Sequence, residues 1–233
     1  IKVDLRDEQT DLRNQGGRNT CITFAATAAM EAAYKRAGYG DINLSEEFMN
    51  YMGKTFWLHP KWDEIAANGE DAWESQTGLF AGGGGVGYLE FISRSDFKIP
   101  REQNMPYRTG GYPVSDYPMA QYAWNDDYWN LQKRRSDFNL DPRNLTDSVL
   151  KASAYYDIQS FRVLDPINPA AGARNPELIE QALKDHKEVV WDFRVAWNFG
   201  GDSLIWRPCE GGVNSCVSNA HSMLIVGFDT TSE

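Results

Sequence analysis

The chain has 233 residues, of which 42% are hydrophobic and 24% are charged, and its net charge is −10. This is ordinary globular composition in a chain long enough to bury a core without metals or disulfides, so wholesale disorder is excluded. The acidic charge argues against a general nucleic-acid binder, and no apolar run approaches the 18 residues that a membrane span needs.

The first half of the sequence predicts helices. From Cys21 the chain is rich in helix formers and apolar on nearly all sides, which predicts a buried helix of about 15 residues that stops at Gly38. Cys21 then lies in the first turn, where unpaired backbone N–H groups and the helix dipole favour an anion. Ser45 predicts the cap of a second helix over residues 46–52, and residues 88–92 begin a third.

The segments between and after these helices are less regular. Residues 53–80 are aromatic and acidic with weak periodicity, which indicates an irregular insertion or lid. Residues 104–130 contain three prolines and many aromatic residues, which favours an extended crossing segment over a helix.

The second half predicts strands. Apolar and alternating runs indicate strands over residues 155–163, 188–195, 204–206 and 222–228, and Asn175 and Pro176 open one helix that runs through Leu183. We therefore predict an α+β protein with a helical N-terminal lobe over residues 1–111 and a β-rich C-terminal lobe over residues 112–233.

The three cysteines have different contexts. Cys209 and Cys216 lie seven residues apart in a loop that contains glycine and asparagine, which favours a local disulfide. Two free thiols in a reducing compartment are the alternative, and a zinc site is less favoured because no second pair of ligands lies at suitable spacing. A disulfide would indicate an oxidising compartment. Cys21 would then be an unpaired cysteine that needs a chemical explanation.

The three histidines also differ. His59 lies in the aromatic insertion, and His186 lies at the end of a predicted helix, where a solvated capping role is the ordinary one. His221 begins the most apolar strand of the chain. A lone histidine on a strand is more often structural, but a thiolate at a helix start is activated by a neighbouring imidazolium. Cys21 and His221 are therefore candidates for a catalytic pair.

Six segments resemble the papain-like cysteine peptidase family, in the family's order and over nearly the whole chain. Residues 14–25 read Asn-Gln-Gly-Gly-Arg-Asn-Thr-Cys-Ile-Thr-Phe-Ala and resemble the signature Asn-Gln-Gly-x-Cys-Gly-Ser-Cys-Trp-Ala-Phe-Ser. The other five are Val3-Asp4-Leu5-Arg6, Leu44-Ser45-Glu46-Glu47, Ala81-Gly82-Gly83, Met105-Pro106-Tyr107 and the run from Asn219 through Ala220 and His221 to Phe228. The resemblance implies a papain-like two-lobe fold with the active-site cleft between the lobes.

The resemblance also implies roles for individual residues. Cys21 would be the nucleophile and His221 the general base and acid, while the Gln15 amide and the Cys21 backbone N–H would donate to the oxyanion. The substrate backbone would lie along Gly82 and Gly83, with Ala220 beside it. The implied activity is thiol-dependent hydrolysis of peptide or protein substrates, with no cofactor and no metal. The family further implies a zymogen with a propeptide or a protein inhibitor. The oxidising compartment that a Cys209–Cys216 disulfide would indicate is a secreted, periplasmic or lysosome-like one.

The sequence departs from the family pattern at several positions. Cys21 and His221 are 200 residues apart, whereas the family's spacing is roughly 130–150 residues. Residues 53–80 and 112–150 are the candidate insertions. The segment Arg18-Asn19-Thr20 replaces the family's Cys-Gly-Ser, so one half of a family disulfide is absent, and Ile22 replaces a tryptophan.

The largest departure follows His221. The family orients its histidine with an asparagine from a later Asn-Ser-Trp-Gly motif, whereas this sequence ends 12 residues after His221 without such a motif. A lobe cut short at this point would have an open sheet edge. We therefore expect a second chain or a C-terminal segment to complete the β-rich lobe.

Two other functions remain compatible with these residues. The chain could be an inactive papain-like binding domain, or another Cys–His acyl-transfer enzyme such as an amidase or a peptidase that processes leader peptides. The joint presence of Gln15, Cys21 and His221 favours an enzyme over a relic. The Leu-Ser-Glu and Gly-Gly segments favour the papain-like group, so a cysteine peptidase is the predicted function.

Overall fold

A computed structural model describes residues 1–16, 18, 20–58, 84–94, 98–108, 140–152, 156–158, 160–196 and 217–231. Its first half contributes β1 (Lys2–Asp4), α1 (Cys21–Tyr34), α2 (Glu46–Met52) and α4 (Gly84–Arg94). Its second half contributes α6 (Asp147–Leu150), α7 (Pro169–Gly172), α8 (Pro176–Lys184), β2 (Val189–Ala196), β3 (Val217–Ile225) and β4 (Gly227–Asp229). Short 3-10 turns cover residues 6–8, 102–104 and 142–144, and π-helical turns cover residues 35–39 and 53–58.

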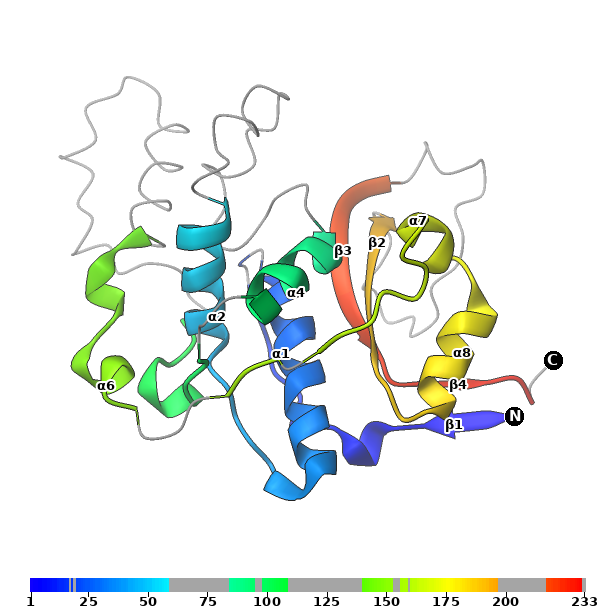
Figure 1. Cartoon of the computed structure of the whole chain (residues 1–233), viewed down its shortest axis with the longest axis horizontal. Helices are drawn as coiled ribbons and strands as arrows, with labels where there is room; N and C mark the ends of the chain where they lie inside the picture. The colour runs from blue at the N-terminus through cyan, green and yellow to red at the C-terminus, as the bar shows by residue number, and fades with distance from the viewer. Residues whose placement is uncertain are drawn as a thin grey trace.

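Helix α1 lies in the middle of the molecule, between α2 and the strands β2 and β3 (Figure 1). It packs against α2, α4, β3 and β2, and α4 also contacts β2. The residues of α1 are small and apolar on most sides, so these neighbours approach closely. The helix continues into the π-helical turn and ends where Gly38 adopts a φ of +88°, a conformation that favours glycine. The predicted start at Cys21 and stop at Gly38 are confirmed.

Helix α2 is buried along its whole length, and Ser45 caps it. The Ser45 hydroxyl accepts a hydrogen bond from Phe48 N at 3.0 Å and donates one to the Met105 carbonyl at 2.6 Å. The cap therefore ties α2 to the segment that contains Met105. Tyr88 of α4 is fully buried and donates its hydroxyl to the Met49 carbonyl of α2. These contacts confirm the predicted Ser45 cap.

The main core lies where these helices meet. Its buried members come from α1, α2, α4, α6 and the loops between them: Ile22, Ala26, Met30, Ile42, Leu44, Phe48, Met49, Tyr51, Met52, Tyr88, Ile92, Ile99, Met105 and Val149. Full burial of one such aliphatic side chain contributes roughly 1.5–3 kcal/mol to stability. This core fixes α1, whose first residue is Cys21, and the helices α2 and α4 that come after it in the chain.

The described strands form two antiparallel pairs. In the first, β1 pairs with β4, and Val3 faces Phe228. A Cβ atom on Gly227 would lie 2.6 Å from the Val3 carbonyl oxygen, so only glycine allows this close approach. In the second, β2 pairs with β3, and Phe193 faces His221. The strand predictions over residues 188–195 and 222–228 are confirmed, although an irregular residue at position 226 divides the second into β3 and β4.

An ion-pair cluster joins the end of α1 to the start of β2. Glu188, whose side chain is 2% exposed, accepts hydrogen bonds from Arg36 and from Gln9 Nε2. Arg36 also pairs with Glu8, which in turn contacts the His186 ring at 2.6 Å from Nδ1. His186 thus belongs to a surface ion-pair cluster.

Helix α8 confirms another prediction, because Asn175 caps it and Pro176 is its first residue. The predicted strand over residues 155–163 is wrong for its described part: Tyr156 forms one bridge to Ile99, and residues 160–163 are irregular. The predicted irregular insertion is wrong for its described part, because residues 53–58 form a π-helical turn. Its remaining residues, the predicted strand over residues 204–206 and the boundary at residue 111 lie outside the described residues. In the part of the chain that is described, no helix is long and apolar enough to cross a membrane.

Candidate active site

Cys21 is the first residue of α1, as the sequence predicts. Its side chain is partly buried, and its thiol forms no disulfide. Thr20 precedes the helix, and its carbonyl accepts the first helical hydrogen bond from Phe24 N at 3.1 Å. The thiol therefore lies in the first turn of the helix, beside backbone N–H groups that have no helical partner.

His221 lies near the middle of β3, on the strand that packs against α1. Its ring is partly buried and meets the Phe193 ring edge to face, with 5.8 Å between ring centroids. Burial lowers the pKa of His221 below its ordinary value, so the neutral imidazole is favoured near pH 7. Among the described residues no hydrogen bond joins the Cys21 thiol to this ring. The fold brings together the helix and the strand that carry the two residues, α1 and β3.

Gln15 lies six residues before Cys21, and its side chain is turned back along its own loop. Its Nε2 donates to the Arg18 carbonyl at 3.0 Å. A primary amide has two N–H groups, so this bond leaves a second donor for a ligand. The loop bond fixes the amide near the start of α1, which is compatible with the predicted oxyanion role.

Tyr107 connects both ends of this loop. Its hydroxyl donates to the Gln15 carbonyl at 2.8 Å and accepts from the Thr20 hydroxyl at 2.6 Å. Its ring packs edge to face against Phe24 in the first turn of α1, with 4.8 Å between centroids. The side chain of Tyr107 therefore contacts the loop at both ends, at Gln15 and at Thr20, and also contacts the helix that follows the loop.

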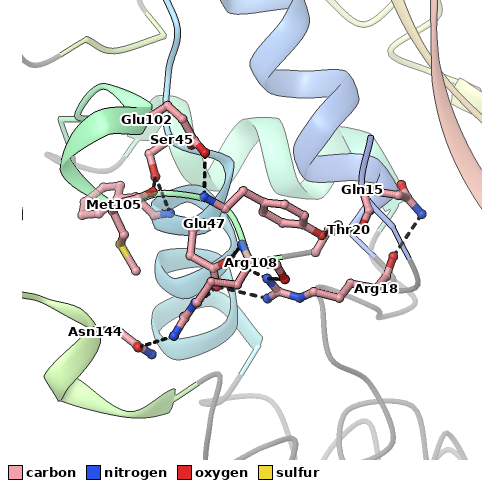
Figure 2. A network of polar contacts seen from close by, with 11 residues as sticks. Gln15, Arg18, Thr20, Ser45, Glu47, Glu102, Met105, Arg108 and Asn144 are labelled. Carbon is pink, nitrogen blue, oxygen red and sulfur yellow. Dashed lines mark hydrogen bonds and ion pairs between the residues drawn. The ribbon is translucent and has the colours of Figure 1, made fainter. Parts of the chain in front are cut away.

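A buried ion-pair cluster lies under the same loop, and Figure 2 shows its members with Gln15 and Thr20. Arg18 is 1% exposed, and its guanidinium donates to both carboxylate oxygens of Glu47 on α2, at 2.5 and 3.1 Å. Arg108 donates to the same carboxylate at 2.9 Å from its side chain, and its carbonyl accepts from Arg18. Burial alone would raise the pKa of Glu47, but the two guanidiniums outweigh it and hold the pKa below its usual value.

Sequence reasoning missed this cluster. Arg18 occupies the position of the family's half-cystine, and Glu47 lies in the Leu-Ser-Glu segment, so both residues belong to segments that resemble the family's motifs. A charged residue in place of a buried half-cystine was the available signal, because such a charge must find a partner. The structure shows that the partner is the second glutamate of residues 44–47.

Several predicted site residues lie outside the described part of the chain. These are Gly82 and Gly83, expected along the substrate, and Cys209 and Cys216, expected to form a disulfide. Ala220 is described only as a member of β3 opposite Arg194. No group of three or more potential metal ligands gathers within the described ranges.

Comparisons with known proteins support the fold. The sequence matches no protein-family model and no curated protein. Among solved structures the chain is similar to the Carica candamarcensis cysteine protease CMS1MS2 in complex with E-64, with a TM-score of 0.51 and 17% sequence identity. The alignment covers 97% of this chain and 76% of the plant protease. At this identity the similarity is one of fold: the mixed helix-and-strand architecture is distantly papain-like.

Proposed function

We propose that this protein is a cysteine peptidase that hydrolyses peptide bonds through Cys21 and His221. The observation that carries the proposal is the position of Cys21 at the N-terminus of α1, on a helix that packs against the strand bearing His221. A helix start and an imidazole are the two features that activate a thiol. The similarity to a cysteine protease fold supports the same conclusion.

The residues would act in two half-reactions. His221 takes the proton of the Cys21 thiol, and the sulfur attacks the carbonyl carbon of the substrate while the C=O electron pair moves to oxygen. The Cys21 backbone N–H and Gln15 Nε2 stabilise this oxyanion. Collapse of the intermediate breaks the C–N bond, and His221 gives its proton to the leaving amine. Water, deprotonated by His221, then attacks the thioester and releases the acid and the free thiol.

The substrate side of the proposal follows the family pattern. A peptide or protein substrate would lie along Gly82 and Gly83, with Ala220 near the scissile bond, and a propeptide or inhibitor would occupy the same groove. A disulfide between Cys209 and Cys216, and with it an oxidising secreted, periplasmic or lysosome-like compartment, remains part of the prediction. Mass spectrometry of the native protein tests the disulfide, because two free thiols at Cys209 and Cys216 would contradict both the disulfide and the oxidising compartment.

One experiment separates the peptidase from its alternatives. The protein is treated with an epoxysuccinyl inhibitor, and intact-mass and peptide mapping locate the adduct. Labelling at Cys21 that is lost in His221→Ala but kept in His186→Ala supports an activated thiol; an unlabelled Cys21 supports an inactive binding domain. Digestion of a peptide library then distinguishes general peptide hydrolysis from an amidase or a leader-peptide processing enzyme, which would leave most of the library intact.

A further inference from the structure

The loop of residues 15–20 determines how far the candidate oxyanion donor lies from the candidate nucleophile. Gln15 begins the loop and Cys21 follows it. In the proposed reaction a peptide carbonyl would contact both residues. Donors act on an oxyanion only within a few tenths of an ångström of hydrogen-bond distance, and a misplacement of about 1 Å can reduce the rate 10²-fold. Whatever fixes this loop therefore affects the rate without contacting the substrate.

Tyr107 has the contacts that this task requires. Its hydroxyl bonds the Gln15 carbonyl and the Thr20 hydroxyl, so the residue at the start of the loop and the residue before Cys21 share one anchor. The anchor is itself held: Tyr107 N donates to Glu102 Oε1 at 2.6 Å, and the ring packs against Phe24.

The cluster of Arg18, Glu47 and Arg108 also contacts Tyr107. The Arg18 guanidinium carbon lies 4.8 Å from the centroid of the Tyr107 ring. The same guanidinium pairs with Glu47, which also holds Arg108, the next residue after Tyr107. The loop and the residue after Tyr107 are thus both connected to helix α2 by charge-assisted bonds to the buried Glu47 carboxylate, and such bonds are shorter and stronger than neutral ones.

We propose that Tyr107 is a positioning residue for the oxyanion site, and that the Arg18–Glu47–Arg108 cluster holds it and the loop in register with α1. The proposal rests on the proposed function, and it adds residues that the expected catalytic set does not contain. An ionic cross-link between residue 18 and α2 also holds the loop in a manner independent of the redox state of any cysteine.

The test is Tyr107→Phe, which removes the hydroxyl and keeps the ring. The expected result is a decrease of about 10-fold in kcat with KM changed by less than about twofold, because the loss acts on the transition state. Tyr34→Phe is the matched control. Tyr34 lies in the last turn of α1, and its hydroxyl forms hydrogen bonds with the backbone of Asp157. This control variant should lose similar stability and keep kcat. An unchanged kcat in Tyr107→Phe would overturn the proposal.

A double-mutant cycle with Gln15→Ala measures the coupling between the two substitutions in their effects on kcat. A purely structural role of Tyr107 would produce no such coupling. If Tyr107 acts through the oxyanion loop, Tyr107→Phe should cost about 10-fold in the wild-type background and less than about twofold in the Gln15→Ala background. Full additivity of the two effects would show that Tyr107 acts elsewhere, and the proposal would fail.

The alkylation rate of Cys21 by iodoacetamide separates this proposal from the proposed function. A wild-type chain that neither hydrolyses peptides nor reacts with the epoxysuccinyl inhibitor would refute the proposed function. The effect of Tyr107 on the loop can still be measured in that chain. Tyr107→Phe should change the rate of Cys21 alkylation several-fold, and Tyr34→Phe should not. Equal rates in wild type and Tyr107→Phe would overturn the positioning role whether or not the chain is a peptidase.

Discussion

Phe193 meets the ring of His221 edge to face across the β2–β3 pair, with 5.8 Å between ring centroids and 69° between ring planes. Phe193 in turn stacks on Trp191, with centroids 4.5 Å apart, and Trp191 Nε1 donates to the Ala173 carbonyl at 3.0 Å. The imidazole therefore has an aromatic neighbour that is anchored to the segment after α7. These contacts restrict the ring by packing.

Replacement of Phe193 should change the titration of His221. Burial lowers the pKa of His221, and Phe193→Ala exposes one side of the ring, so the pKa should rise toward its ordinary value of 6.5. An NMR titration of the imidazole carbon-bound protons measures this change. Phe228→Ala, which removes a half-buried phenylalanine from β4, is the control and should leave the His221 midpoint unchanged. A lower or unchanged midpoint in Phe193→Ala would contradict the assigned cause.

If the wild-type protein hydrolyses peptides as proposed, its pH profile should reflect the same shift in the pKa of His221. His221 must be neutral to accept the thiol proton, and its lowered pKa extends the neutral form to lower pH. The rising limb of kcat/KM should therefore have its midpoint below 6.5 in an assay from pH 4 to 9. A midpoint above 6.5 would indicate that an ion pair with the thiolate dominates over burial.

The three candidate catalytic residues should rank in a fixed order. Cys21→Ala should abolish hydrolysis, and His221→Ala should cost nearly as much because nucleophile and base act as one unit. Gln15→Ala should lower kcat on the order of 10²–10³-fold, as for one oxyanion donor. His186→Ala removes a surface histidine and should leave kcat unchanged. A Gln15→Ala variant with lower stability but normal kcat would assign Gln15 a structural role.

Stability should fall as the pH rises from 4.5 to about 7 because of Glu46. Burial raises the pKa of Glu46 from 4.5 to about 7, although Arg13 opposes the shift. The folded state thus keeps a proton that the unfolded state loses in this window, so the free energy of unfolding decreases by up to about 1.4 kcal/mol per pH unit. Urea unfolding at pH 5 and pH 8 measures the decrease, which Glu46→Gln should largely remove. An equal slope in both proteins would refute this assignment.

Glu47→Gln should be strongly destabilising. The substitution leaves the buried guanidinium of Arg18 without the carboxylate that it contacts, which should cost on the order of 3 kcal/mol. Glu90→Gln breaks an exposed ion pair with Arg94 and is the matched control, with an expected change below about 0.5 kcal/mol. Chemical unfolding followed by circular dichroism gives both values. Similar values for the two variants would show that the buried cluster contributes little.

Much of the fold could be predicted because its signals are local. The caps Ser45 and Asn175 each lie just before the helix they start, and Gly38 marks the end of α1. The apolar runs that form β2 and β3 are equally visible in sequence. The wrong strand over residues 155–163 shows the limit of this approach, because a loose alternation does not reveal that, among the described residues of this stretch, only Tyr156 has a pairing partner, Ile99.

The site was only partly predictable for a different reason. Cys21 and Gln15 could be proposed from their spacing and their resemblance to a motif. Arg18 and Glu47 are 29 residues apart and would each be interpreted as solvated surface charges. Only the packing of α2 against the loop brings them together, and Tyr107 comes from farther still, 92 residues after Gln15.

The pairing of β1 with β4 has a consequence for the order of folding. The ammonium group of Ile1 donates to the Thr230 hydroxyl at 2.9 Å, and these residues are 229 positions apart. Closing so long a loop lowers the chain entropy before the contacts of the strand pair have formed. Helices α1 and α2 can form from short-range contacts, so their entropy cost is smaller. The two terminal strands should therefore join after the helices have assembled. They should also separate first, so that amide exchange in β1 precedes exchange in α1.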